Sequence, residues 1–252
     1  MWRLAWPTVI QNMIGGLQGI VDHVMVGHYV GFTGNAAIGV GWQIFLVVVV
    51  FISSLFTGMG VLVARFAGAN NPEKVNRVVY QAFLTAVILA LGVLAPLGYV
   101  LSPALLELVH ASPEVRAEAL PYLRTMFVCS IGQLLYFMIA GALRAAGDAR
   151  TCLRIGMWII GLNVGLNMIL IRGMGPIPGF GAQGAALGTS IASTVASGFG
   201  LWLMATGRVV VNFRGVPRRP DWHIIRQLFK FGLPAGVQGV AMNVAGVLLL
   251  RF

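Results

Sequence analysis

One aspartate lies inside an apolar stretch of this sequence, where a carboxylate can do acid–base or ion-binding chemistry. Asp22 has apolar residues on both sides in GLQGIVDHVMVG, residues 16–27. An ionised carboxylate at the centre of a bilayer costs about 2.5–3.5 kcal/mol on insertion scales, and such groups usually mark ion or substrate pathways. We therefore expect Asp22 to be a functional group that binds a proton or a cation.

Three neutral polar residues in later apolar stretches have chemistry that suits a carboxylate. Asn163 and Asn167 are four residues apart in NVGLNMIL, so they share one face of a helix. Thr189 lies in GAALGTSIAS. These oxygen ligands suit Na⁺ or a proton and do not suit a soft metal. The alternative is structural, because Asn side chains often join membrane helices and Thr often bonds to its own helix.

The composition is that of an integral membrane protein. The 252 residues are 58% hydrophobic and 10% charged, whereas soluble domains are about 25% charged. The net charge of +10 does not indicate a nucleic-acid partner, because the basic residues lie between apolar runs. The sequence shows no Ser-His-Asp pattern, phosphate-binding loop or metal-ligand cluster. We therefore expect a lipid bilayer around the protein, no enzyme activity and no cofactor beyond a coupling ion.

The apolar runs predict an all-α, polytopic fold, since a spanning helix needs about 20 apolar residues. The predicted spans are 4–29, 36–65, 75–102, 118–143, 152–172, 183–206 and 227–251. The first six are complete and form a lobe over residues 1–206. A basic linker follows at 207–226, and residues 227–252 are interpreted as the first helix of a truncated second lobe.

The loop charges predict the orientation. One side has thirteen Lys and Arg residues, namely Arg3 and the basic residues of the loops after spans two, four and six. The other side has Arg116, Arg124 and Arg172. The positive-inside rule then puts the N-terminus in the cytoplasm of a cell with an inner (plasma) membrane. In ASPEV, Ser112 and Pro113 are expected to start the fourth span, and Gly147 with Asp148 is expected to end it.

A faint internal repeat joins the first and seventh spans. WPTVIQ contains Pro7 and Gln11, and LPAGVQ contains Pro234 and Gln238, with the same spacing between proline and glutamine. Internal repeats are common in transporter folds. A second repeat unit would therefore begin near residue 233.

Several stretches together resemble a known transporter family. LAWPTVIQNMIGGLQGIVDHVMVG, AAIGVGWQ, GMGVLVARFAGANN, ALRAAGDARTCL, NVGLNMILIRG and GFGAQGAALGTSIAS occur in the order and spacing of the MATE (multidrug and toxic compound extrusion) family. The resemblance runs from about residue 3 to the chain end. It implies twelve spans in two six-helix lobes. It also implies export of small amphipathic, usually cationic compounds in exchange for H⁺ or Na⁺.

The resemblance also implies roles for individual residues. One branch of the family has an aspartate fifteen residues after the proline of span one, which is the spacing from Pro7 to Asp22. Independently of the resemblance, Pro7 removes a backbone hydrogen bond, so we expect span one to bend there. The same ion-coupling network implies roles for two polar residues of span five, a threonine of span six and a tyrosine near the start of span four. These correspond to Asn163, Asn167, Thr189 and Tyr122.

Three features depart from the family pattern. In the proton-coupled branch the second span-five position is often an acid, and here it is Asn167. A second branch has a glutamate eight residues after the proline of span seven, and here that position is Met242. Asp22 is therefore the one expected carboxylate of the site, and both H⁺ and Na⁺ stay open. The chain also holds a single lobe, so we expect a fragment that needs a C-terminal lobe, rather than a half-transporter that dimerises.

Two other functions compete with antiport. A lipid-linked sugar flippase of the same superfamily would need several basic residues in its cavity, and the spans contain almost none. A membrane scaffold that transports nothing would leave Asp22 without a purpose.

Overall fold

A computed structural model describes residues 2–173, 178–213, 215–217 and 219–249. At positions 2–5, 7, 8, 12, 14, 15, 17, 18 and 242–249 it describes the backbone alone. The described part is helical, with the bounds α1 (Trp2–Tyr29), α2 (Phe32–Gly68), α3 (Pro72–Ile88), the π-helical η1 (Leu89–Leu94), α4 (Ala95–Leu108), α5 (Pro113–Val128), α6 (Ser130–Ala145), α7 (Ala149–Leu170), α8 (Gly181–Thr206) and α9 (Trp222–Leu249).

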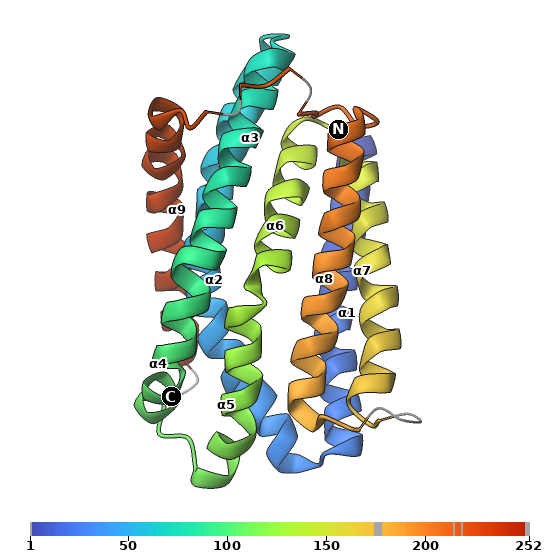
Figure 1. The fold of residues 1–252 in the computed structure, drawn as a ribbon, viewed down its shortest axis with the longest axis vertical. Coiled ribbons are helices and arrows are strands. Elements are labelled where there is room, and N and C mark those ends of the chain that lie inside the picture. The colour runs from blue at the N-terminus through green and yellow to red at the C-terminus, as the bar shows by residue number, and fades with distance from the viewer. Residues whose placement is uncertain (1, 174–177, 214, 218, 250–252) are drawn as a thin grey trace.

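The helices form one elongated bundle whose loops gather at its two ends (Figure 1). The N-terminal end of α1, the turns after α2 and α6, and the segment after α8 lie at one end, and the turns after α1, α4 and α7 lie at the other. This is the division into sides that the loop charges predict.

The predicted spans correspond to these helices with two internal irregularities. The third span is one run through α3, η1 and α4, and the fourth is α5 and α6, bent by 52° between Val128 and Ser130. Among the described residues, four helices are long and apolar enough to cross a membrane, or five when the bent pair is one span.

The predicted limits of the fourth span are confirmed. Ser112 Oγ accepts a hydrogen bond from the Val115 amide at 3.4 Å at the start of α5. After α6, Gly147 has a φ of 90°, and Asp148 Oδ1 accepts from the Thr151 amide at 3.1 Å to start α7. A residue with a side-chain acceptor at the N-cap satisfies an amide that the helix leaves free.

Helix α8 packs closely on α7 because glycine occupies the contact. A Cβ at Gly184 would lie 2.7 Å from the Leu170 carbonyl carbon, and a Cβ at Gly188 would meet the side chain of Asn167. Small residues let membrane helices approach until their backbones touch. This approach positions the polar residues of α7 against those of α8.

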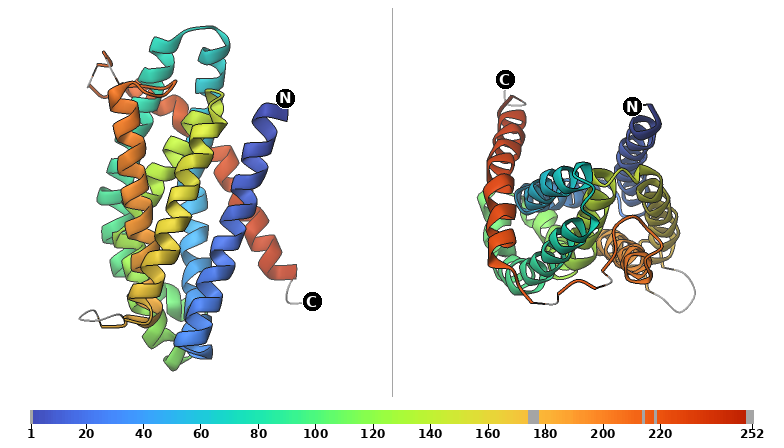
Figure 2. Two further views of the ribbon diagram at one scale, coloured as in Figure 1. Left: turned by 90° about the vertical axis from the view of Figure 1, so that its right-hand side faces the viewer. Right: turned by 90° about the horizontal axis from the view of Figure 1, so that it is seen from above.

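Helix α9 is also fixed to the lobe through glycines, here against α2. A Cβ at Gly232 would lie 2.7 Å from Leu55 Cα, and one at Gly58 would lie 2.8 Å from the Gly232 amide nitrogen. The helix begins at Trp222, inside the predicted linker 207–226, because Asp221 Oδ1 accepts from the His223 amide at 3.1 Å and caps it. Figure 2 shows α9 running obliquely across the bundle.

The linker ahead of α9 is tied to α3. Gln81 Nε2 donates to the Arg219 carbonyl oxygen at 2.9 Å, and Gln81 Oε1 accepts from the Asp221 amide at 3.1 Å. Arg77 and Asp221 form an ion pair at 2.8 Å, and Asn76 Oδ1 accepts from the Asn212 amide at 2.9 Å. The described part of the linker therefore lies against the lobe.

Candidate functional site

Helices α1, α7 and α8 bring together four polar residues from three separate stretches of the sequence. Asn167 Nδ2 donates to Asp22 Oδ1 at 2.6 Å, and the Asn163 side chain lies 2.9 Å from Thr189 Oγ1. Asn163 and Asn167 are fully buried, and Thr189 is buried as well. The four-residue spacing on α7 points both amides to the same side, as the sequence predicts.

The Asn163 amide has two orientations that satisfy its neighbours differently. In one, its nitrogen donates to Thr189 Oγ1 at 2.9 Å and its oxygen accepts from Asn167 Nδ2 at 3.3 Å. In the other, its nitrogen donates to Asp22 Oδ1 at 3.1 Å while its oxygen accepts from Thr189 Oγ1 at 2.9 Å and from the Thr189 amide at 3.3 Å. The second orientation gives the carboxylate two amide donors.

One buried acceptor of this cluster lacks a donor among the described residues. Asn167 Oδ1 is buried and has no hydrogen-bond partner there. It faces Gly188, where a Cβ would collide with it. A buried carbonyl oxygen without a donor is costly, and such an oxygen beside a carboxylate is also a ligand that a hard cation accepts. The oxygen atoms of Asp22, Asn163, Asn167 and Thr189 therefore form a cluster whose chemistry suits a hard cation.

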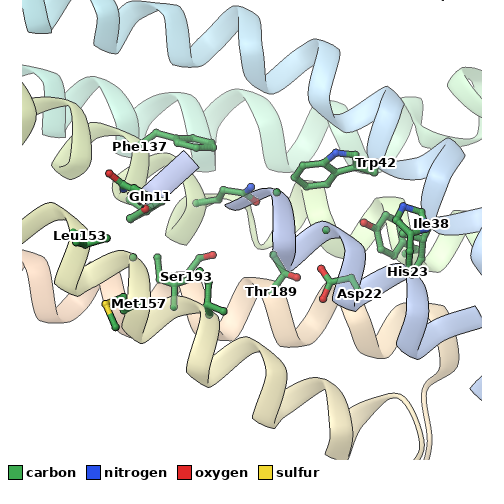
Figure 3. Close-up of a pocket in the computed structure, with 18 residues that line it drawn as sticks. Gln11, Asp22, His23, Ile38, Trp42, Phe137, Leu153, Met157, Thr189 and Ser193 are labelled. Carbon is green, nitrogen blue, oxygen red and sulfur yellow. Dashed lines mark hydrogen bonds between the residues drawn. The ribbon is translucent and has the colours of Figure 1, made fainter. Parts of the chain in front are cut away.

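The cluster borders a cavity of about 420 Å³ inside the lobe. Its walls come from α1, α2, α5, α6, α7 and α8, and they include Gly16, Gly19, Ile38, Trp42 and Ile159. Figure 3 shows Asp22 and Thr189 toward one end, near Trp42 and His23, with Gln11 and Leu153 toward the other. Among the described lining residues, Asp22 is the one carboxylate, and none is Lys or Arg.

Tyr122 of α5 lines the same cavity but stands apart from the hydrogen-bonded cluster. It is 4% exposed, and its ring packs on α2, where a Cβ at Gly41 would lie 2.9 Å from Tyr122 Cε1. Within the described residues its hydroxyl has no hydrogen bond to Asp22, Asn163 or Thr189. Pro7 falls inside α1, but its side chain lies outside the described residues, so a bend at this proline stays a prediction.

Sequence reasoning missed a second polar cluster at the other end of the cavity. Gln11 Nε2 donates to the Tyr136 hydroxyl at 2.8 Å, while Gln11 Oε1 accepts from Arg144 at 3.4 Å and lies 3.3 Å from Cys152 Sγ. These contacts join residues more than 120 positions apart, so no local motif reveals them. Gln11 belongs to the repeated WPTVIQ segment, which was the one available signal.

His23 also makes a contact that the sequence does not indicate. Its Nδ1 lies 2.5 Å from Asn35 Oδ1, which joins α1 to the start of α2. His23 lines the cavity beside Asp22. Among the described residues, no three His, Cys, Asp or Glu side chains gather as they would around a transition metal.

Known proteins share this arrangement of helices. The model of the MatE family matches residues 7–169. The chain is 27% identical to the probable multidrug resistance protein NorM of Acinetobacter baylyi, over 94% of this chain and 53% of that protein. It is 28% identical to the probable multidrug resistance protein NorM of Thermotoga maritima, over 98% of this chain and 52% of that protein.

Solved structures agree on the fold. A MOP superfamily transporter from Pyrococcus furiosus superposes with a TM-score of 0.87 at 24% identity, over 97% of this chain and 53% of that one. The outward-facing conformation of a multidrug resistance MATE family transporter gives 0.86 at 24% identity, with the same coverage of both chains. The chain spans about half the length of these relatives. Since the family match covers more than half of the sequence, the chain belongs to the MATE family of membrane transporters.

Proposed function

We propose that this chain is one lobe of a secondary active antiporter that exports small amphipathic cations in exchange for H⁺ or Na⁺. The observation that carries the proposal is the position of Asp22. Its carboxylate accepts a hydrogen bond from a fully buried amide and borders a cavity with mainly apolar walls. A charge in such surroundings needs compensation, and either a coupling ion or a cationic substrate supplies it.

Antiport follows if the two cations compete for the same carboxylate. With a proton or Na⁺ on Asp22, the cluster is neutral and a cationic substrate has no partner in this part of the cavity. After the ion leaves, the carboxylate favours a substrate cation. The two states must also differ in conformation, because coupling needs a difference in affinity between two states for both ligands. Bending of α1 at Pro7 is our proposed difference.

Which coupling ion the site binds depends on how the amides of Asn163 and Asn167 interact with Asp22. Protonated Asp22 needs an acceptor, and a turn of the Asn163 amide presents its oxygen in place of its nitrogen. For Na⁺, the free oxygen of Asn167 and Thr189 Oγ1 join the carboxylate as ligands. We favour H⁺, because one carboxylate is enough for it, while Na⁺ is the alternative.

The charge of the cavity argues against a lipid-linked sugar flippase. A pyrophosphate substrate calls for basic residues, and the described lining holds none. The apolar walls with one carboxylate fit an amphipathic cation.

Export requires a second lobe in this proposal. The chain corresponds to about half of each relative, and a cavity between two lobes needs both of them. The 252-residue chain alone is therefore expected to insert into membranes without exporting drugs. Resistance of pump-deficient cells that express this chain alone would contradict the proposal and favour a half-transporter that dimerises.

The proposed orientation places the N-terminus and the linker in the cytoplasm of a plasma-membrane protein. Single cysteines at the exposed positions Glu114 and Val210 test it, in a chain without its two native cysteines. A membrane-impermeant thiol reagent outside the cell should label the first and spare the second. The reverse pattern would contradict the orientation.

The decisive test of function is efflux from vesicles that contain the assembled two-lobe transporter. A fluorescent amphipathic cation is loaded, and a proton or a sodium gradient is then imposed. We expect export under one of the two gradients and none without a gradient. Export that is independent of both gradients would rule out ion antiport.

A further inference from the structure

A second cavity lies on the face of the lobe formed by α4, α5 and α8, which is turned to the viewer in Figure 1. Its volume is about 380 Å³, and its lining includes Tyr99, Arg124, Thr125, Gln183 and Leu187. Helix α1 lies on the other side of α8 from this face (Figure 2, left). In a two-lobe transporter whose lobes meet along α1 and α9, this cavity would open to lipid.

Arg124 places a permanent positive charge in this cavity. Its guanidinium carbon lies 4.4 Å from the centre of the Tyr99 ring. Its Nε is buried and has no hydrogen-bond partner among the described residues. The two ion pairs within the described part of the chain use Arg77 and Arg116. The Arg124 side chain as a whole is half-buried. An arginine in a membrane helix needs an anion or further acceptors, and the described protein supplies an aromatic face alone.

The predicted span limits place Arg124 near the outer end of the fourth span. Arg124 lies six residues after residue 118, where the predicted apolar run of the fourth span begins, or about 9 Å along the helix. The helix itself begins earlier, at Pro113. Side chains on a helix lean toward its N-terminus. The N-terminus of α5 follows the loop after α4, so the Arg124 side chain leans toward that loop. Tyr99 lies three residues before the predicted end of the third span. Arginine and tyrosine commonly occupy the ends of membrane spans.

We propose that this cavity binds the phosphate of a phospholipid from the outer leaflet. A guanidinium binds a phosphate through two parallel hydrogen bonds. The two terminal amino groups of Arg124, which have no hydrogen-bond partner among the described residues, would donate them. Gln183 Nε2 donates to Thr125 Oγ1 at 3.2 Å, and both side chains line the cavity beside Arg124. Leu120, Val128 and Leu187 give the same cavity an apolar wall suited to an acyl chain. The assignment to the outer leaflet rests on the proposed orientation, and the site itself does not depend on transport.

The test is lipid retention by the purified 252-residue chain, measured by native mass spectrometry. The chain is titrated with palmitoyl-oleoyl phosphatidylglycerol and, separately, with a palmitoyl-oleoyl glycerol that lacks the phosphate. We expect the phospholipid to bind at least about tenfold more tightly, as charge-assisted hydrogen bonds provide. Equal binding of the two lipids would overturn the proposal.

Variants locate the phosphate at Arg124. Arg124→Gln should weaken phosphatidylglycerol binding about tenfold, and Arg124→Lys should weaken it less, because the charge remains. The matched control is Arg116→Gln on the same helix, whose arginine pairs with Glu107 outside the cavity and which should bind as the unmodified chain does. Unchanged binding by Arg124→Gln would overturn the site.

Two further readouts keep the result interpretable. If Arg124→Gln does not fold, Arg124→Lys and the comparison of the two lipids on the unmodified chain still decide the question. Inorganic phosphate should fail to displace the bound phospholipid. Displacement by inorganic phosphate would assign the cavity to a free anion and overturn the lipid proposal.

Discussion

The two ends of the inner cavity contain similar polar groups in very different surroundings. At one end, Asp22 meets the fully buried amides of Asn163 and Asn167. At the other end, Gln11 joins Tyr136 to Arg144, and Arg144 is exposed. A hydrogen bond at the buried end cannot be replaced by water, whereas a group at the exposed end can turn to solvent.

This difference indicates which end can couple ions to movement. Asp22 is half-buried and its amide partners are fully buried, so a change of its charge is weakly screened. We expect the protein to respond by turning an amide, binding a cation or changing conformation. A change at Arg144 is screened by nearby water. The buried end is therefore expected to hold the ion site. The exposed end is expected mainly to attach α1 to α6 and α7 through the contacts of Gln11.

The largest effect is expected from Asp22→Asn. The amide keeps the size of the carboxylate but removes its charge and its titration, so gradient-driven efflux by the assembled transporter should fall to the background. Asp148→Asn is the matched control, because Asp148 caps α7 outside the cavity and asparagine caps a helix equally well. If Asp22→Asn exports as well as the unmodified transporter does, the ion site is not at the buried end of the cavity.

The next effect is expected from Gly188→Ala, which disturbs the buried end without removing a polar group. The added methyl group would collide with Asn167 Oδ1, so the chain should lose about 1–3 kcal/mol of unfolding free energy. Gly198→Ala on the same helix has open space around its Cβ and should be neutral or slightly stabilising. Thermal unfolding of both variants in detergent measures the difference. Equal melting temperatures would show that α8 can move away from α7 at little cost.

Asn163→Ala and Thr189→Ala should each have an intermediate effect. Each removes one side of a buried hydrogen bond and should cost about 1–3 kcal/mol of stability, with weaker coupling in efflux assays. Since the two side chains bond to each other, the double variant should cost less than the sum of the single ones. Additive costs in a double-mutant cycle would argue that the two residues act independently.

The smallest effect is expected from Gln11→Ala at the exposed end. Arg144 can turn to water after the loss of its partner, so the cost should be about 0.5–1 kcal/mol and efflux should persist. Unfolding and efflux measurements on Gln11→Ala and Asn163→Ala, made in parallel, compare the two ends directly. A larger loss of unfolding free energy or of efflux in Gln11→Ala than in Asn163→Ala would show that the exposed end matters more than the buried end.

Much of the fold could be predicted from the apolar runs, because a membrane helix must satisfy its own backbone and fill the bilayer. The cluster around Asp22 was also predictable in part. The spacing of Asn163 and Asn167 places them on one face of α7, but their contact with Asp22 depends on how closely α7 and α8 pack. That closeness comes from Gly184 and Gly188, whose effect is visible only in three dimensions.

Other features had no signal in the sequence. The 52° bend between α5 and α6 occurs at Cys129, which is neither a proline nor a glycine. Gln81 lies within the predicted third span, and its sequence context does not indicate that it binds the linker at two points. Both features depend on partners far along the chain, such as Ser197, which donates to the Gly132 carbonyl oxygen just past the bend at 2.7 Å.

The attachment of the linker has a mechanical consequence. A segment between two lobes is the usual place for a pivot, but here its described residues are tied to α3 through Arg77 and Gln81. Just beyond it, α9 touches the α2 backbone through Gly232. The linker and the first turns of α9 should therefore move together with the lobe. Any rocking between the lobes would then change the position of later parts of α9 relative to the second lobe, while the linker keeps its conformation.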